Sequence, residues 1–186
     1  MSHIDLQNDF PGIRGPMAYR PETSAPLNAL AEVLLRGENS LSRGDRELIA
    51  TYVSALNDCY FCQQVHGGYA QHYMACDTQL IDAVKNDFIT SAISAKMKLL
   101  LWIAGSVQKG GKNVTQDQVN IARSAGATDM EIHDTVLIAA AFCMFNRYVD
   151  GLATWAPEKR EYYIERSKLR ADEAYLTHDP ANNKLI

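Results

Sequence analysis

From Leu27 almost to the end of the chain, apolar positions recur at the spacing of an α-helix. Few stretches alternate between apolar and polar residues, and no pair of apolar runs is joined by a two-residue hairpin turn. The pattern predicts helices over residues 27–36, 42–57, 59–74, 78–88, 92–109, 116–125, 129–153 and 157–172. We therefore expect an all-α protein.

Three of these helices begin with a hydroxyl side chain placed three residues before an acceptor side chain, as in a capping box. The pairs are Ser42 with Asp45, Thr115 with Gln118, and Thr128 with Glu131. Glu131 is therefore interpreted as a capping residue.

The two ends of the chain differ in composition from the helical middle. Residues 1–26 hold four of the six prolines and predict an extended arm. Residues 27–154 are expected to form the helical domain, and 155–186 a C-terminal helix and tail. The segment 157–169 is strongly charged and carries an aromatic stripe. We expect a helix with a solvated face, and a strap across a neighbouring subunit is the alternative.

The sequence repeats itself weakly. When residues 45–67 are moved forward by 84 positions onto residues 129–151, eight of 23 positions are identical. The match predicts a duplicated helical hairpin. In the second copy Asn146 stands where the first has Cys62, and Asp150 stands where the first has His66.

Composition limits the classes of function. The net charge of −4, with no basic cluster, argues against a nucleic-acid partner. The longest apolar runs, 99–104 and 136–145, are too short to span a bilayer, so we expect core or subunit interface there and no membrane partner. No signal pattern opens the chain, and we expect a soluble, cytoplasmic protein. Cysteine pairs in a reducing cytosol are more often catalytic or metal-binding than structural.

The densest chemistry lies in the run Cys59-Tyr60-Phe61-Cys62-Gln63-Gln64-Val65-His66, with Glu47 twelve residues upstream of Cys59. Asp58 is a natural N-cap, so Cys59 is expected in the first turn of a helix, with Cys62 and His66 on the same face. Backbone N–H groups at a helix start favour a thiolate, and a nearby histidine can accept or relay a proton. An antiparallel return would bring Glu47 close to this set.

Other readings of these residues stay open. Zinc is a rival ligand, since Cys, His and Glu all bind it, although structural zinc sites usually draw ligands from two separate knuckles. The thiols could also be packing residues, and Glu47 a solvated carboxylate. The isolated Cys76 and Cys143 are interpreted as small buried hydrophobes.

The run from Asp45 to Gly67 resembles the core of the alkylhydroperoxidase D / carboxymuconolactone decarboxylase family, and more narrowly its uncharacterised peroxidase-related branch. The family pattern of a Glu, twelve residues to a Cys, then C-x-x-C-x-x-x-H is matched at every one of its four positions. Residues 145–150 are also similar to that branch. The resemblance covers roughly residues 27–153 and implies an all-helical fold that assembles into trimers or hexamers.

The resemblance also implies roles for the four residues. Cys62 resembles the peroxidatic cysteine, and Cys59 the resolving cysteine that closes a disulfide with it. Glu47 and His66 resemble the proton relay. The best-known members carry a histidine just before the second cysteine, where this chain has Phe61, so a shorter or slower relay is expected.

The implied activity is a thiol peroxidase that reduces a hydroperoxide and is reset by an external dithiol, either a reductant protein or a lipoyl-type carrier. No organic cofactor is required. The alternatives are a zinc-binding helical module and a lyase of the carboxymuconolactone decarboxylase type, with Glu47 and His66 as acid and base. Retention of both cysteines argues against the lyase.

Overall fold

The computed structural model describes residues 2–175, and every regular element in this part of the chain is helical. The elements are α1 (Arg14–Tyr19), α2 (Pro21–Arg36), α3 (Arg43–Leu56), α4 (Tyr60–Met74), α5 (Thr78–Asp87), α6 (Ala95–Lys109), the short 3-10 helix η1 (Gly111–Asn113), α7 (Gln116–Ser124), α8 (Asp129–Gly151) and α9 (Arg160–Arg170). The expected all-α class is confirmed.

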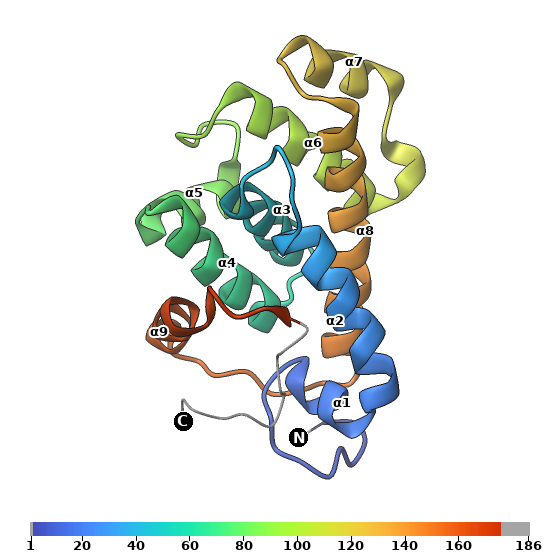
Figure 1. Cartoon of the computed structure of the whole chain (residues 1–186), viewed down its shortest axis with the longest axis vertical. Helices are drawn as coiled ribbons and strands as arrows, with labels where there is room; N and C mark the ends of the chain where they lie inside the picture. The colour runs from blue at the N-terminus through green and yellow to red at the C-terminus, as the bar shows by residue number, and fades with distance from the viewer. Residues whose placement is uncertain (1, 176–186) are drawn as a thin grey trace.

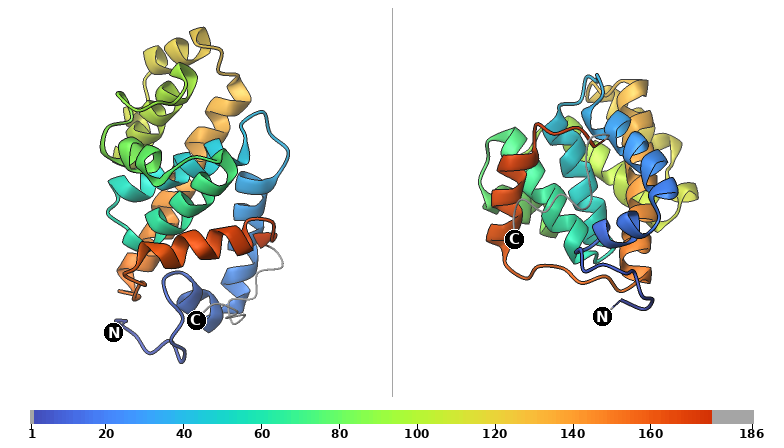
Figure 2. Two further views of the ribbon diagram at one scale, coloured as in Figure 1. Left: turned by 90° about the vertical axis from the view of Figure 1, so that its left-hand side faces the viewer. Right: turned by 60° about the horizontal axis from the view of Figure 1, so that its bottom comes forward.

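The main core lies where α3, α6 and α8 meet (Figure 1). Leu48, Ile49 and Val53 of α3 pack there against Leu100 of α6 and Ile138 of α8, and all five are fully buried. Burying apolar side chains of this size is the main driving force for folding. α4 packs along α3, and α9 crosses α4 on the side away from this core (Figures 1 and 2). Packing in the core therefore sets the position of α3, and packing against α3 sets the position of α4.

The turn between α3 and α4 sets the position of the thiols. Ser42 and Asp45 form the expected capping box at the start of α3. Asp58 has a φ of 56° in the left-handed region, which aspartate tolerates better than most residues. Cys59, and not Asp58, is the N-cap of α4. The expectation that Cys59 lies in the first turn is wrong, because the chain reverses at Asp58 and enters the helix one residue later.

The internal repeat does not produce a second hairpin. Residues 129–151 form the single helix α8, whereas the first copy is broken between α3 and α4. Asn57 and Asp58, which make that break, are replaced in the second copy by Ala141 and Phe142. Alanine favours helix, and neither residue supplies the side chain that supports a left-handed turn, so the second copy stays helical.

The N-terminal segment is not extended throughout. Residues 14–19 form α1, and α2 begins at Pro21, six residues before the expected start at Leu27. Proline at the first helical position costs little, because its missing N–H would have no partner there. Pro21 therefore marks a helix start.

The charged C-terminal helix is packed against its own chain. One face of α9 is buried and consists of Tyr163, Arg166, Ser167 and Arg170. Glu165 and Lys168 on the other side are exposed, so the helix has the expected solvated face as well as a packed one. A Cβ added at Gly68 of α4 would lie 3.0 Å from the Tyr163 carbonyl oxygen, so a glycine is needed for the close crossing. Whether α9 also contacts a neighbouring subunit stays a prediction, and the tail beyond Tyr175 lies outside the described residues.

The two apolar runs are largely core, but not entirely. Trp102 on α6 and Met130, Leu137 and Met144 on α8 are exposed. Positions 130, 137 and 144 are seven residues apart and share one face of α8. Within residues 2–175, no helix is both long enough and apolar enough to cross a membrane.

Candidate functional site

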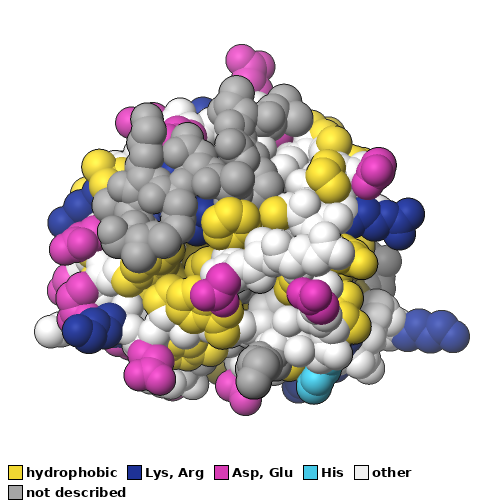
Figure 3. All heavy atoms as spheres, turned by 90° about the horizontal axis from the view of Figure 1, so that it is seen from below, with side chains coloured by type: hydrophobic (Ala, Val, Ile, Leu, Met, Phe, Trp, Pro, Cys, Tyr) yellow, Lys and Arg dark blue, Asp and Glu magenta, His cyan; other side chains and the backbone are white. Residues whose placement is uncertain are grey.

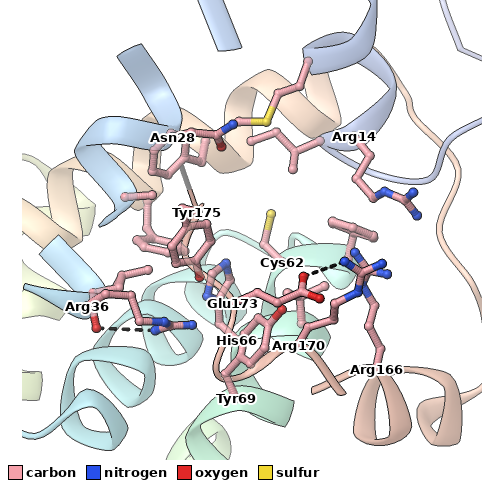
Figure 4. A pocket seen from close by; sticks show the side chains of 18 of the residues that line it. Arg14, Asn28, Arg36, Cys62, His66, Tyr69, Arg166, Arg170, Glu173 and Tyr175 are labelled. Carbon is pink, nitrogen blue, oxygen red and sulfur yellow. Dashed lines mark hydrogen bonds and ion pairs between the residues drawn. The ribbon is translucent and has the colours of Figure 1, made fainter. Parts of the chain in front are cut away.

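A cavity of about 90 Å³ lies where α1, α2, α4, α8 and α9 meet, and Cys62 and His66 of α4 both line it (Figure 4). The Cys62 sulfur points into this space. Cys59 is not among the residues that line the cavity. Of the two thiols, Cys62 is therefore the one that a small molecule in the cavity meets.

The two thiols are close together in an apolar environment. Both are buried, in a small cluster with Phe61, Val149 and Tyr163. A hydrogen bond with the Cys62 thiol, together with burial, raises the pKa of Cys59 well above its ordinary value. Cys59 is therefore held as the neutral thiol while the pair is reduced.

The predicted meeting of Glu47 and His66 is found in the structure. Glu47 on α3 is fully buried, and its Oε2 lies 2.6 Å from His66 Nδ1. Its Oε1 accepts a hydrogen bond of 2.5 Å from the Arg36 guanidinium. Burial alone would raise the pKa of Glu47, but His66 and Arg36 outweigh it and lower that pKa below its ordinary value. Glu47 is thus an ionised carboxylate in the core, and the reading of Glu47 as a solvated side chain is wrong.

This contact also orients the His66 ring. An ionised carboxylate only accepts hydrogen bonds, so Nδ1 must carry the hydrogen that faces Glu47. In the neutral ring Nε2 is then the basic nitrogen. The edge-to-face contact with Phe142, with ring centroids 4.5 Å apart, helps to hold the ring. His66 is thus a fixed imidazole with one nitrogen committed to Glu47.

Phe61 forms part of the apolar wall. Its ring packs against Tyr163 with a centroid separation of 6.1 Å, and a Cβ added at Gly12 would lie 2.2 Å from it. The position of Phe61, which is a histidine in the best-known members of the family that the sequence resembles, is therefore a buried hydrocarbon surface in this site.

Several residues at the site were missed by the reasoning from the sequence. Arg36 pairs with Glu47, and the Tyr175 hydroxyl lies 3.4 Å from Glu47 Oε1. The Asp150 carboxyl lies close enough to the Cys59 thiol to influence its titration, and partial desolvation of this otherwise exposed side chain raises the pKa of Asp150. Arg166 of α9 lines the cavity. Asp150 was noticed only as the counterpart of His66, and nothing in the local spacing marked the others.

The remaining candidates lie apart from this site. Cys76 and Cys143 pack against the main core as expected of small hydrophobes, but they are only partly buried. Glu131 forms the expected capping box with Thr128 and also binds Lys96 at 2.9 Å. Within residues 2–175, no three His, Cys, Asp or Glu side chains are grouped so that they could hold a metal ion.

The model of the carboxymuconolactone decarboxylase family matches residues 21–103, which contain Glu47, Cys59, Cys62 and His66. Over these residues the chain is similar to that family. The match to this family ends within α6, so α1, α8 and α9, which complete the cavity, lie outside it.

Solved structures share the fold over most of the chain. An uncharacterised peroxidase-related protein from Silicibacter sp. TM1040 is 25% identical, with a TM-score of 0.73 over 80% of this chain and 77% of its own. A structure described as an alkylhydroperoxidase AhpD core, from Ralstonia eutropha JMP134, is 25% identical, with a TM-score of 0.73 over 78% of this chain and 76% of its own. A protein of unknown function from Agrobacterium tumefaciens shows the same fold at 19% identity, with a TM-score of 0.71 over 86% of this chain and 100% of its own. No curated protein matches the sequence.

The expected relationship is therefore confirmed, and the helical fold with it. The two comparisons carry different names: the family model is named for a decarboxylase, whereas two of the similar solved structures are described as peroxidase-related.

Proposed function

We propose that this protein is a thiol peroxidase that reduces a hydroperoxide through Cys62 and Cys59. The observation that carries the proposal is the different position of the two thiols relative to the cavity. Cys62 lines the cavity beside His66, while Cys59 lies behind it in hydrogen-bond contact. The description of the neighbours as peroxidase-related supports the same chemistry.

In the first step His66 Nε2 accepts the proton of the Cys62 thiol. His66 is one helical turn from Cys62, and the Glu47 carboxylate stabilises the imidazolium that forms. The thiolate attacks the terminal oxygen of the hydroperoxide and breaks the O–O bond. Cys62 becomes a sulfenic acid, and the leaving alkoxide takes a proton from the imidazolium to give the alcohol.

In the second step Cys59 attacks the sulfenic sulfur, and a Cys59–Cys62 disulfide forms with loss of water. The Cys59 thiol must first lose its proton, and Asp150 is a neighbouring carboxylate that can accept it. Because Asp150 is itself exposed, the proton can pass on to solvent. An external dithiol then reduces the disulfide by exchange and is itself oxidised.

The test is consumption of a hydroperoxide with dithiothreitol as the reductant, for the wild type, Cys62→Ser and the control Cys143→Ser. We expect Cys62→Ser to lose the activity and Cys143→Ser to keep it. Equal rates for the wild type and Cys62→Ser would refute the proposal.

A lyase of the decarboxylase type is the second candidate. The family match and the buried Glu47–His66 pair favour it, since that pair is a ready acid and base. Turnover of a carboxylated lactone that survives replacement of both Cys59 and Cys62 by serine would support the lyase against the peroxidase.

A further inference from the structure

Three arginines lie on one wall of the cavity, although the whole chain carries a net charge of −4. Arg14 comes from α1, and Arg166 and Arg170 come from α9. Each is at most 5% exposed. In Figure 4 their guanidinium groups gather on the side of the cavity opposite Arg36, and Cys62 lies between.

The three arginines differ in their partners. Glu173 binds Arg170 at 2.5 Å. Arg166 Nη1, in contrast, is buried and has no hydrogen-bond partner within residues 2–175. Burial and the neighbouring charge of Arg166 lower the pKa of Arg14, so these cations feel one another. A buried cation donor without a partner is costly, and an anion in the cavity would offset that cost.

Much of the remaining lining is apolar. Met17, Leu35, Phe142 and Phe145 line it together with the Cys62 sulfur. Seen from below in Figure 3, hydrophobic side chains also gather in the middle of this end of the molecule, and acidic side chains stand around them. A ligand that suits both walls has an anionic head and a hydrocarbon body.

We propose that this cavity binds small amphipathic carboxylates, with the carboxylate on Arg166 and the hydrocarbon part along Leu35, Phe142 and Phe145. A guanidinium donates two parallel hydrogen bonds to a carboxylate, and such a charged pair is strongest away from water. The binding proposal also names a substrate class, and this part of it rests on the proposed peroxidase function. The substrates would be hydroperoxides that carry a carboxylate and whose peroxide group reaches Cys62.

Binding is tested without any chemistry, on the Cys62→Ser protein. Hexanoate and 1-hexanol, which share a six-carbon chain but differ in charge, are titrated and followed by NMR. Charge-assisted hydrogen bonds predict that hexanoate binds about tenfold more tightly or better. Adding Arg166→Met should abolish this preference, Arg166→Lys should keep part of it, and Arg147→Met, which removes an exposed arginine of α8, should leave it unchanged. Equal binding of the two probes, or a preference that survives Arg166→Met, would overturn the proposal.

A second experiment separates this proposal from the peroxidase itself. The wild type and Arg166→Met are compared for turnover of a fatty-acid hydroperoxide and of tert-butyl hydroperoxide. We expect Arg166→Met to raise KM for the fatty-acid hydroperoxide much more than KM for tert-butyl hydroperoxide. Equal binding of hexanoate and 1-hexanol would refute the binding proposal but not the peroxidase. Absence of turnover for both hydroperoxides in the wild type would sink the peroxidase and leave the hexanoate result standing.

Discussion

Replacing Glu47 by glutamine should destabilise the fold far more than the same change at Glu131, its counterpart in the internal repeat. Both carboxylates are almost fully buried, and in both helices a threonine hydroxyl bonds the glutamate carbonyl at 2.7 Å. The two sites differ in the cation. The side chain of Arg36 is 3% exposed, whereas that of Lys96 is 34% exposed.

The size of the effect follows from that difference. Glu47→Gln leaves the Arg36 guanidinium buried without its counter-charge, and breaking a buried pair in this way costs about 3–5 kcal/mol. Lys96 can turn to water after Glu131→Gln, so that change should cost about 1 kcal/mol. A domain of ordinary stability, about 5–15 kcal/mol, would still fold after either change.

The assay is urea unfolding followed by circular dichroism, with the free energy of unfolding compared at pH 7 and at lower pH. Because the pKa of Glu47 is lowered in the folded state, its stabilisation is fully present above its ordinary value of 4.5 and is lost as the pH falls through the folded-state pKa. The deficit of Glu47→Gln should therefore be largest at pH 7 and shrink in acid. A Glu47→Gln protein no less stable than Glu131→Gln at pH 7 would refute this reasoning.

Three further predictions concern the thiols and the wall behind them. In the reduced protein, iodoacetamide should modify Cys62 before Cys59, because Cys62 lines the cavity. Peptide mass spectrometry gives the order of modification, and the reverse order would count against Cys62 as the thiol that meets the substrate. Asp150→Asn should slow formation of the disulfide from the sulfenic acid about tenfold or more, while the exposed control Asp117→Asn should not slow it. Rapid-quench mass spectrometry measures the rate, and an unchanged rate in Asp150→Asn would remove Asp150 from the mechanism. Gly12→Ala combines a left-handed φ of 56° with a Cβ 2.2 Å from the Phe61 ring, so it should cost about 2–4 kcal/mol in urea unfolding. The control Gly126→Ala has a φ of 88° and open space around it, and it should cost only about 1 kcal/mol; equal losses would mean that Phe61 does not hold this loop.

The helices were predictable because each carries its own signal. Apolar spacing marks α3, α6 and α8, and the capping boxes at Ser42, Thr115 and Thr128 fix three of the starts. Errors arose where one residue type has two meanings. Pro21 was interpreted as part of an extended arm and instead begins α2, and the repeat predicted a turn that Ala141 and Phe142 do not make.

The heart of the site was predictable for a similar reason. Cys59, Cys62 and His66 lie within one short run, and a tight turn at Asn57 and Asp58 was enough to bring Glu47 to His66. The structure brings Glu47 to His66 and places Cys62 at the cavity, while the catalytic roles of the four residues remain a proposal.

The rest of the site depends on contacts between distant segments. Arg36 reaches Glu47 from another helix, and Arg14 and Arg166 come from opposite ends of the chain. Only the packing of α9 across α4 brings Arg166 to the cavity. No local spacing encodes such a contact, so the sequence alone points to the cysteine pair but not to the charged wall of the cavity.

The central claim is that Cys62 reacts with a hydroperoxide and Cys59 resolves the product. Mass spectrometry of the thiols before and after one equivalent of hydroperoxide tests it most directly. We predict a Cys59–Cys62 disulfide in the wild type, and in Cys59→Ser a sulfenic acid on Cys62 that a dimedone probe captures. If both thiols stay reduced, or if oxidation falls on Cys76 or Cys143 instead, the account is contradicted.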